Sequence, residues 1–128
     1  MSDRRDMVRR ALVVEDEILV AMYVEDLLTE LGYGVVAIAT ELDEALPVAR
    51  REAFELAVLD VNLNGKLSFP IADVLRERKI PFLFASGYGS KGLADGYKGA
   101  VHIQKPFVIG DLEAAIARAG AGRRDRER

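Results

Sequence analysis

Three acidic residues of this sequence each follow a short apolar run, at the point where a buried strand would end. Glu15 and Asp16 follow Ala11–Val14, and Asp60 follows Leu56–Leu59. Carboxylates that converge repel one another, so they either take up protons or hold a cation. With no histidine or cysteine among them, they offer the hard oxygen ligands that suit Mg²⁺.

A hydroxyl and an amine follow two further apolar runs. Ser86 comes directly after Phe82–Ala85, and Lys105 comes shortly after Ala100–Ile103. The lysine ammonium suits a phosphoryl oxygen, and the serine hydroxyl can donate a hydrogen bond to another. With the acids, they fit transfer of a phosphoryl group to a carboxylate nucleophile, a reaction in which the protein mainly supplies position and charge neutralisation.

Each of these residues has a simpler interpretation when it is taken alone. Glu15 or Asp16 could cap a helix, and Asp60 could be an ordinary loop acid. Ser86 could belong to a turn, and Lys105 could be a solvated surface residue. For all of these interpretations to hold at once, in this order and spacing, would be a coincidence. The combined interpretation depends on the elements that bring these residues together.

Short apolar runs alternate with helical patterns along the chain. The predicted strands are 11–15, 35–39, 56–59, 82–85 and 100–103, and the predicted helices are 18–31, 42–53, 71–78 and 112–119. Gly32 is expected to end the first helix. Pro47 lies inside the second, which should therefore begin late or kink. Residues 62–68 are predicted to be a loop, and the glycines between 87 and 99 predict at most a short, mobile helix.

This alternation predicts a (βα)₅ fold of the α/β class. Strands that are apolar throughout indicate a parallel sheet with helices on both faces, and right-handed crossovers leave few topologies for it. In such sheets a ligand site forms beyond the carboxyl ends of the strands. The acids, the hydroxyl and the amine would then meet in one pocket.

The amino-acid composition argues against several classes of protein for this chain. Half of the residues are hydrophobic, which suffices for one core, and the sequence has no cysteine for disulfides or zinc. Its apolar runs fall short of the roughly 18–20 residues that span a bilayer, and its charged start does not resemble a signal peptide. A net charge of −3 disfavours nucleic-acid binding, although arginines cluster near both ends. We expect a cytoplasmic protein that binds neither nucleic acid nor membrane.

Four motifs resemble those of the response-regulator receiver domains of two-component systems. They are Val13-Val14-Glu15-Asp16-Glu17, Leu59-Asp60, Ala85-Ser86-Gly87 and Lys105-Pro106-Phe107. Their order and spacing match that family across about residues 9–120. The resemblance implies a flavodoxin-like, doubly wound sandwich with a five-stranded parallel sheet of order 2-1-3-4-5. It divides the chain into a flexible N-terminus (1–8), a receiver domain (9–120) and a charged C-terminal tail (121–128).

The resemblance also implies a role for each acid. Asp60 resembles the phosphoacceptor of the family. Asp16 resembles a direct Mg²⁺ ligand, and Glu15 its partner acting through water. The backbone carbonyl of Asn62, two residues after the acceptor, would be a further Mg²⁺ ligand.

The remaining roles concern the phosphoryl group and the switch. Ser86 resembles the switch hydroxyl, and Lys105 would pair with the phosphoryl oxygens; the Lys105–Pro106 bond is usually cis in this family. His102 stands where the family usually has an aromatic residue that moves with the hydroxyl, although a lone histidine on a strand is often only a packing or surface residue. Tyr88 could replace that aromatic residue.

The sequence departs from the family pattern in other places. Leu63-Asn64 replaces a common Met-Pro pair, and Phe69-Pro70 follows a position where glycine is usual. The segment 84–89, Phe-Ala-Ser-Gly-Tyr-Gly, resembles a subfamily with Phe-Ala-Thr-Gly-hydrophobic-Tyr after strand 4. The match is imperfect, because serine replaces threonine and the tyrosine comes one place early.

The resemblance leads to one expected function. We expect a single-domain response regulator that a histidine kinase or a histidine phosphotransferase phosphorylates on Asp60 in a Mg²⁺-dependent reaction. The segment after the last helix is too short for a DNA-binding unit, so output would pass through a protein partner or by onward phosphotransfer. The protein would be a monomer or a phosphorylation-dependent dimer, and it would turn over no free substrate.

Three other functions fit parts of the sequence but not the whole of it. A pseudo-receiver would be a phosphorylation-independent binding module, but such domains have usually lost one of the residues present here. A Mg²⁺-dependent phosphotransferase or phosphatase would need a larger substrate cleft than 128 residues usually provide. A flavin carrier of the same topology would place its phosphate against the acids.

Overall fold

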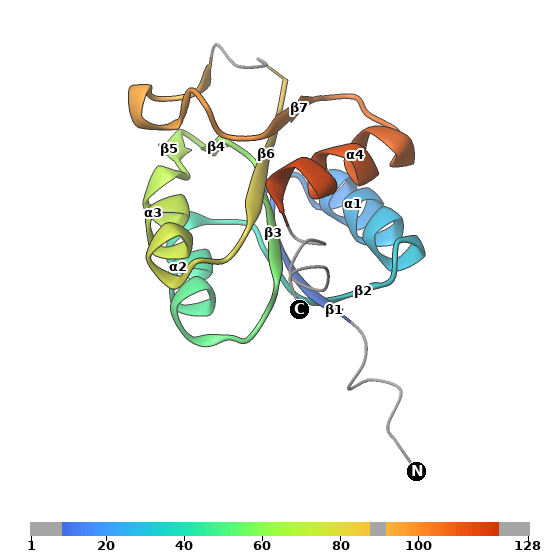
Figure 1. The fold of residues 1–128 in the computed structure, drawn as a ribbon. Coiled ribbons are helices and arrows are strands. Elements are labelled where there is room, and N and C mark those ends of the chain that lie inside the picture. The colour runs from blue at the N-terminus through green and yellow to red at the C-terminus, as the bar shows by residue number, and fades with distance from the viewer. Residues whose placement is uncertain (1–8, 88–91, 121–128) are drawn as a thin grey trace.

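The computed structural model describes residues 9–87 and 92–120, which form one parallel sheet between two layers of helices (Figure 1). The sheet has the order β2-β1-β3-β6-β7. Its strands are β1 (Arg9–Val14), β2 (Tyr33–Ala39), β3 (Leu56–Leu59), β6 (Phe82–Ser86) and β7 (His102–Gln104). Because β4 and β5 pair only with each other, this is the order 2-1-3-4-5, and the predicted flavodoxin-like α/β fold is confirmed.

Two helices cover each face of the sheet (Figure 1). Helices α1 (Ile18–Glu30) and α4 (Ile109–Ala119) lie on one side, and α2 (Leu42–Arg51) and α3 (Phe69–Arg78) lie on the other. Side chains of β1 alternate between the two cores, with Ala11 and Val13 in one and Leu12 and Val14 in the other. All four are at most 1% exposed, which explains why this strand is apolar throughout.

The second helix begins earlier than its proline suggests. Helix α2 starts at Leu42 and includes Pro47, so the expectation of a late start is wrong. Pro47 is exposed and therefore lies on the outer face of the helix, where a backbone carbonyl without a helical partner can bond to water. The carboxylate of Glu44 accepts a hydrogen bond from the amide of Thr40 at 2.8 Å and supports the early start. The prediction for Gly32 is confirmed, since α1 ends just before it and its φ is +96°.

The predicted loop at 62–68 contains a small antiparallel hairpin. Strands β4 (Asn62–Leu63) and β5 (Lys66–Leu67) pair with each other and are joined by Asn64 and Gly65. Both turn residues have positive φ, 54° and 93°, which is the geometry of a type I′ turn. Asn-Gly is a dipeptide that favours this turn. The prediction of a loop without strands at 62–68 is therefore wrong, because the turn brings the residues on either side of it together as a hairpin.

Two elements near the C-terminal end differ from their predicted bounds. The fifth strand begins at His102 instead of Ala100, because the amide of Ala100 bonds to the carbonyl of Tyr97 at 3.0 Å and stays in a turn. Helix α4 begins at Ile109, three residues early. Asp111 explains this start, because its carboxylate accepts a hydrogen bond from the amide of Val108 at 3.0 Å.

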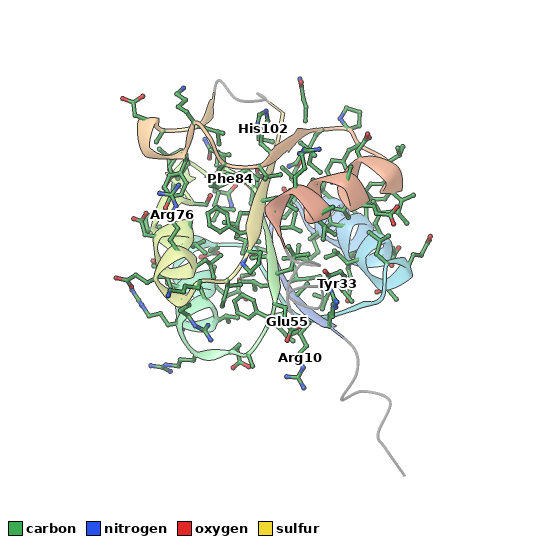
Figure 2. All side chains as sticks on the ribbon, in the orientation of Figure 1. Arg10, Tyr33, Glu55, Arg76, Phe84 and His102 are labelled. Atoms are coloured by element: carbon green, nitrogen blue, oxygen red, sulfur yellow. The ribbon has the colours of Figure 1, made fainter. Side chains whose placement is uncertain are left out.

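The described part of the glycine-rich stretch forms a 3₁₀ helix at Asp95–Tyr97 and no α-helix, in agreement with the prediction of a short element. Tyr97 ties this segment to the second core through ring contacts with Phe69, Phe82 and Phe84. Arg76 of α3 lies 3.8 Å above the Tyr97 ring, and Figure 2 labels it beside α3, together with Phe84. Among the described helices, none has the length and apolarity needed to cross a bilayer.

Candidate functional site

The predicted site residues lie side by side where the strands end. Because Val14 pairs with Leu59 in the register of β1 and β3, the residues that follow them, Glu15 and Asp60, emerge next to each other. The amide of Asp60 donates to the Val14 carbonyl at 2.8 Å, and the amide of Lys105 donates to the Ser86 carbonyl at 2.8 Å. The sheet hydrogen bonds therefore continue into the site and fix its backbone. Arg10 and Glu55 are at the opposite edge (Figure 2).

The three acids converge as expected. Each of Glu15, Asp16 and Asp60 offers one carboxylate oxygen, and these oxygens lie within 4.8 Å of one another. Glu15 is only 3% exposed, whereas Asp16 and Asp60 are half-buried. Three hard oxygen donors at one point fit a cation such as Mg²⁺, which binds through carboxylates and water.

Lys105 balances part of this negative charge. Its Nζ lies 2.6 Å from Oε1 of Glu15 and 3.4 Å from Oδ2 of Asp60. The Lys105 ammonium, which comes from the end of β7, thus lies between the carboxylates of Glu15 and Asp60. The bond between Lys105 and Pro106 is cis, as the resemblance implied.

Backbone amides orient the acids further. The amide of Val61 donates to Oδ1 of Asp60 at 2.8 Å, so the other oxygen of that carboxylate is the one that approaches Lys105. The amide of Glu17 donates to Oε2 of Glu15 at 3.2 Å. Both carboxylates are therefore held at two points, by an amide on one oxygen and by the ammonium near the other.

Burial and charge shift the pKa of each group. Burial raises the pKa of Glu15 to about 7, and the charge of Asp60 adds to this, while the hydrogen bond from Lys105 opposes it. Burial also raises the pKa of Asp60, again against the opposing charge of Lys105. Burial alone would lower the pKa of Lys105, but its hydrogen bond to Glu15 and the charge of Asp60 outweigh burial and raise it.

We expect the Glu15→Gln variant to remove a pH dependence of stability in the metal-free protein. The pKa of Glu15 is about 7 in the folded chain and near 4.5 when unfolded. Its favourable contribution is therefore complete below pH 4.5 and is lost as the pH rises through about 7, a difference of roughly 2–3 kcal/mol. The variant should match wild type at pH 4.5 and exceed its free energy of unfolding at pH 8.

Urea unfolding at both pH values, with a chelator present, would measure this effect. The matched control is Glu17→Gln, which removes an exposed carboxylate two residues away. If wild type and Glu15→Gln lose equal stability between the two pH values, then Glu15 is not the titrating group.

The other predicted residues take the following positions. Ser86 is buried, 3% exposed, at the end of β6, and His102 is half-buried opposite Phe84 in the neighbouring strand. Asn62 begins the hairpin, and its side chain accepts a hydrogen bond from the amide of Gly65 at 2.6 Å. Tyr88 lies outside the described residues.

Two contacts near the site were missed by sequence reasoning. The amide of Asn64 donates to Oδ2 of Asp16 at 3.0 Å, although the Asn64-Gly65 turn signal was present in the sequence. The hydroxyl of Tyr23, on α1, donates to the carbonyl of Phe107 at 2.8 Å. No local pattern could have revealed this second contact, because it joins residues 84 positions apart.

Comparisons of this chain with protein families and with known proteins point to the same family. Residues 11–117 match the response regulator receiver domain family. The transcriptional regulatory protein PdtaR of Mycobacterium tuberculosis is 30% identical over 112 residues, which are 84% of this chain and 55% of that protein. The regulator PhyR of Methylorubrum extorquens is 30% identical over 89% of this chain and 44% of its own. The chain spans about half the length of these curated relatives.

Solved structures agree with the sequence relatives. SdrG from Sphingomonas melonis superposes with a TM-score of 0.80 and 34% identity, covering 93% of this chain and 98% of SdrG. The response regulator PhyR from Brucella abortus gives 0.79 and 26%, covering 94% of this chain and 51% of PhyR. With its sheet order, its converging acids and lysine, and these matches, this chain belongs to the response regulator receiver domain family.

Proposed function

We propose that this protein accepts a phosphoryl group on Asp60 from a histidine kinase or a histidine phosphotransferase, in a Mg²⁺-dependent reaction. The single observation that supports this most is the position of Lys105, whose ammonium lies between the carboxylates of Glu15 and Asp60. A cation held beside a carboxylate at the end of a strand can bind the oxygens of an incoming phosphoryl group.

The residues present fit the metal. Asp16 and Asp60 would bind Mg²⁺ directly, Glu15 would act through water, and the backbone carbonyl of Asn62 would complete the protein ligands. When bound, Mg²⁺ neutralises charge on the carboxylates and on the phosphoryl oxygens.

Three residues of the chain would each have a separate role in the reaction. An oxygen of Asp60 attacks phosphorus and forms the new O–P bond, while the P–N bond to the donor histidine breaks and its electron pair returns to the imidazole. Lys105 holds a phosphoryl oxygen, and the Ser86 hydroxyl donates to another. The protein thus promotes transfer to and from its own carboxylate and needs no free substrate.

The donor would reach Asp60 across an exposed apolar surface beside the site. Side chains of α1 and of the segment before α4 form this surface, and contacts between Tyr23 and Phe107 join the two segments. Its large exposed members are Ile18, Leu19, Met22, Tyr23 and Val108. Exposed hydrophobic residues grouped at one place are typical of protein-binding surfaces. The face around β6, the glycine-rich stretch and α4 is then left for the downstream partner, or for a second copy after phosphorylation.

We assign the receiver domain to residues 9–120. The predicted N-terminal segment (1–8) and the charged C-terminal tail (121–128) lie outside the residues that the structure describes. Signalling would pass by protein–protein interaction or by onward phosphotransfer in the cytoplasm, with neither nucleic acid nor membrane as partner.

The test is incubation with acetyl phosphate, with and without Mg²⁺, followed by intact mass measurement. We expect one phosphoryl adduct that forms only with Mg²⁺, and borohydride trapping with peptide mapping should place it on Asp60. A folded chain that gains no adduct from acetyl phosphate or from phosphorylated histidine phosphotransferases would instead be a pseudo-receiver that acts by binding alone.

A further inference from the structure

The hairpin that follows the phosphoacceptor is built around a turn of fixed geometry. Asn64 and Gly65 are the two central residues between the paired positions Leu63 and Lys66. Their positive φ values, 54° and 93°, match a type I′ turn, in which both central residues have a left-handed backbone conformation. The Asn62 side chain accepts a hydrogen bond from the Gly65 amide at 2.6 Å. The tip of the hairpin is therefore held by backbone geometry and by its own side chain.

The hairpin is also anchored at its base. Leu63 is only 2% exposed and packs in the same core as Leu12 and Val14 of β1. The amide of Ser68 donates to the carbonyl of Val61 at 2.8 Å and closes the loop behind the two strands. With base and tip both fixed, the hairpin holds a defined position over the end of β3.

This position brings one amide of the turn onto an acid from another strand. The Asn64 N–H donates to Oδ2 of Asp16 at 3.0 Å, across 48 residues of sequence. Asp16 is half-buried and belongs to the group of three acids. A hydrogen bond from an amide to a carboxylate is charge-assisted, so it restricts the rotation of the carboxylate more strongly than a neutral bond would.

We propose that the Asn64–Gly65 turn positions the carboxylate of Asp16 for the metal. The donor is a backbone N–H, so its direction depends on the left-handed conformation of the turn rather than on the side chain at position 64. By occupying Oδ2, the turn leaves the other oxygen of Asp16 to face the cation, and the ligand is oriented before binding. This inference rests on the proposed function.

The test changes the turn without adding a steric clash. A Cβ atom at Gly65 would meet nothing within 4 Å, so Gly65→Val acts through the strain of a β-branched residue at a φ of +93°. We expect the Mg²⁺ affinity of the full chain, measured by titration with MgCl₂ alone, to fall by about 5- to 10-fold, since orientation of one charged ligand is lost.

Gly32→Val is a matched control. Gly32 has a φ of +96°, and a Cβ there would also meet nothing within 4 Å, but it lies between α1 and β2, at the edge of the sheet away from the site. It should lose comparable stability and keep its Mg²⁺ affinity within about twofold, because it orients no ligand. Equal weakening in both variants, or unchanged affinity in Gly65→Val, would overturn the proposal while leaving the phosphoacceptor function intact.

A second measurement does not depend on Gly65→Val folding. In metal-free Asp16→Ala, the amide of Asn64 loses its acceptor, so its hydrogen exchange should become about 10-fold faster than in the wild-type chain. The amide of Gly65, which bonds to Asn62, should exchange at its original rate. Unchanged exchange at Asn64 would show that the turn does not hold Asp16. A wild-type chain that binds no Mg²⁺ would overturn this proposal and the proposed function together.

Discussion

The Asp60→Asn variant is expected to take up no phosphoryl group from acetyl phosphate and yet to be more stable than the wild-type chain without metal. The neutral amide cannot replace the carboxylate as a nucleophile, so the adduct should fall to background. Its shape is conserved, and the amide oxygen can still accept the hydrogen bond that Val61 gives to Asp60.

The gain in stability should depend on pH. Burial raises the pKa of Asp60, so its favourable contribution is present below its ordinary value of 3.8 and is lost as the pH rises through the value in the folded protein. The Asp60→Asn variant does not lose this stability, because its side chain does not ionise. Its melting temperature should therefore exceed that of wild type at pH 8, and the difference should disappear near pH 4.

Intact mass and thermal unfolding with a chelator would test both parts. Asp26→Asn, which changes an exposed carboxylate on α1, is the control and should behave as wild type. Adding Mg²⁺ should raise the melting temperature of wild type more than that of Asp60→Asn, because the variant lacks one ligand. An adduct that persists in Asp60→Asn would place the phosphoacceptor elsewhere.

The Lys105→Met variant is expected to separate metal binding from phosphoryl transfer. Removing the ammonium deletes the one side-chain cation that lies within 4 Å of Glu15 and Asp60 among the described residues. Loss of a preorganised charge on the phosphoryl oxygens should slow phosphorylation by acetyl phosphate by roughly 100-fold. Mg²⁺ affinity should instead rise several-fold, because the ammonium no longer competes for the same carboxylates.

Lys105→Met should also be less stable at neutral pH. Two largely buried carboxylates lose their counter-charge, which we expect to cost about 2 kcal/mol, less than for a fully buried pair because Lys105 is 21% exposed. The control is Lys66→Met, whose ammonium is exposed and 4.0 Å from Asp43. If the Lys105→Met variant lost Mg²⁺ affinity and phosphorylation rate in equal proportion, the role of Lys105 would be to organise the acids rather than to contact phosphate.

The sequence pattern predicted the α/β class of the fold and which side chains would converge at the ends of the strands. Short apolar runs such as Leu56–Leu59, alternating with helical patterns, indicate strands buried on both faces, and parallel strands place their carboxyl ends at one edge. Glu15, Asp16, Asp60 and Lys105 could therefore be predicted to converge, and they do. The resemblance supplied the sheet order, which the observed order β2-β1-β3-β6-β7 confirms.

The residues at which helices and strands begin and end were harder to predict, because they depend on single contacts. Helix α2 passes through Pro47 because that residue faces solvent, and α4 starts early because Asp111 caps it. The hairpin around Asn64 and Gly65 cannot be told from a loop by periodicity, because its strands are only two residues long.

Only the tertiary structure decided how the site residues are held. The amide of Asn64 reaches Asp16 across 48 positions, and Lys105 reaches Glu15 across 90. Such contacts depend on the register of neighbouring strands and on the position of the hairpin that follows β3. Residue type and spacing determine which groups meet, but the directions of individual N–H and carboxylate groups emerge only when the whole sheet is packed.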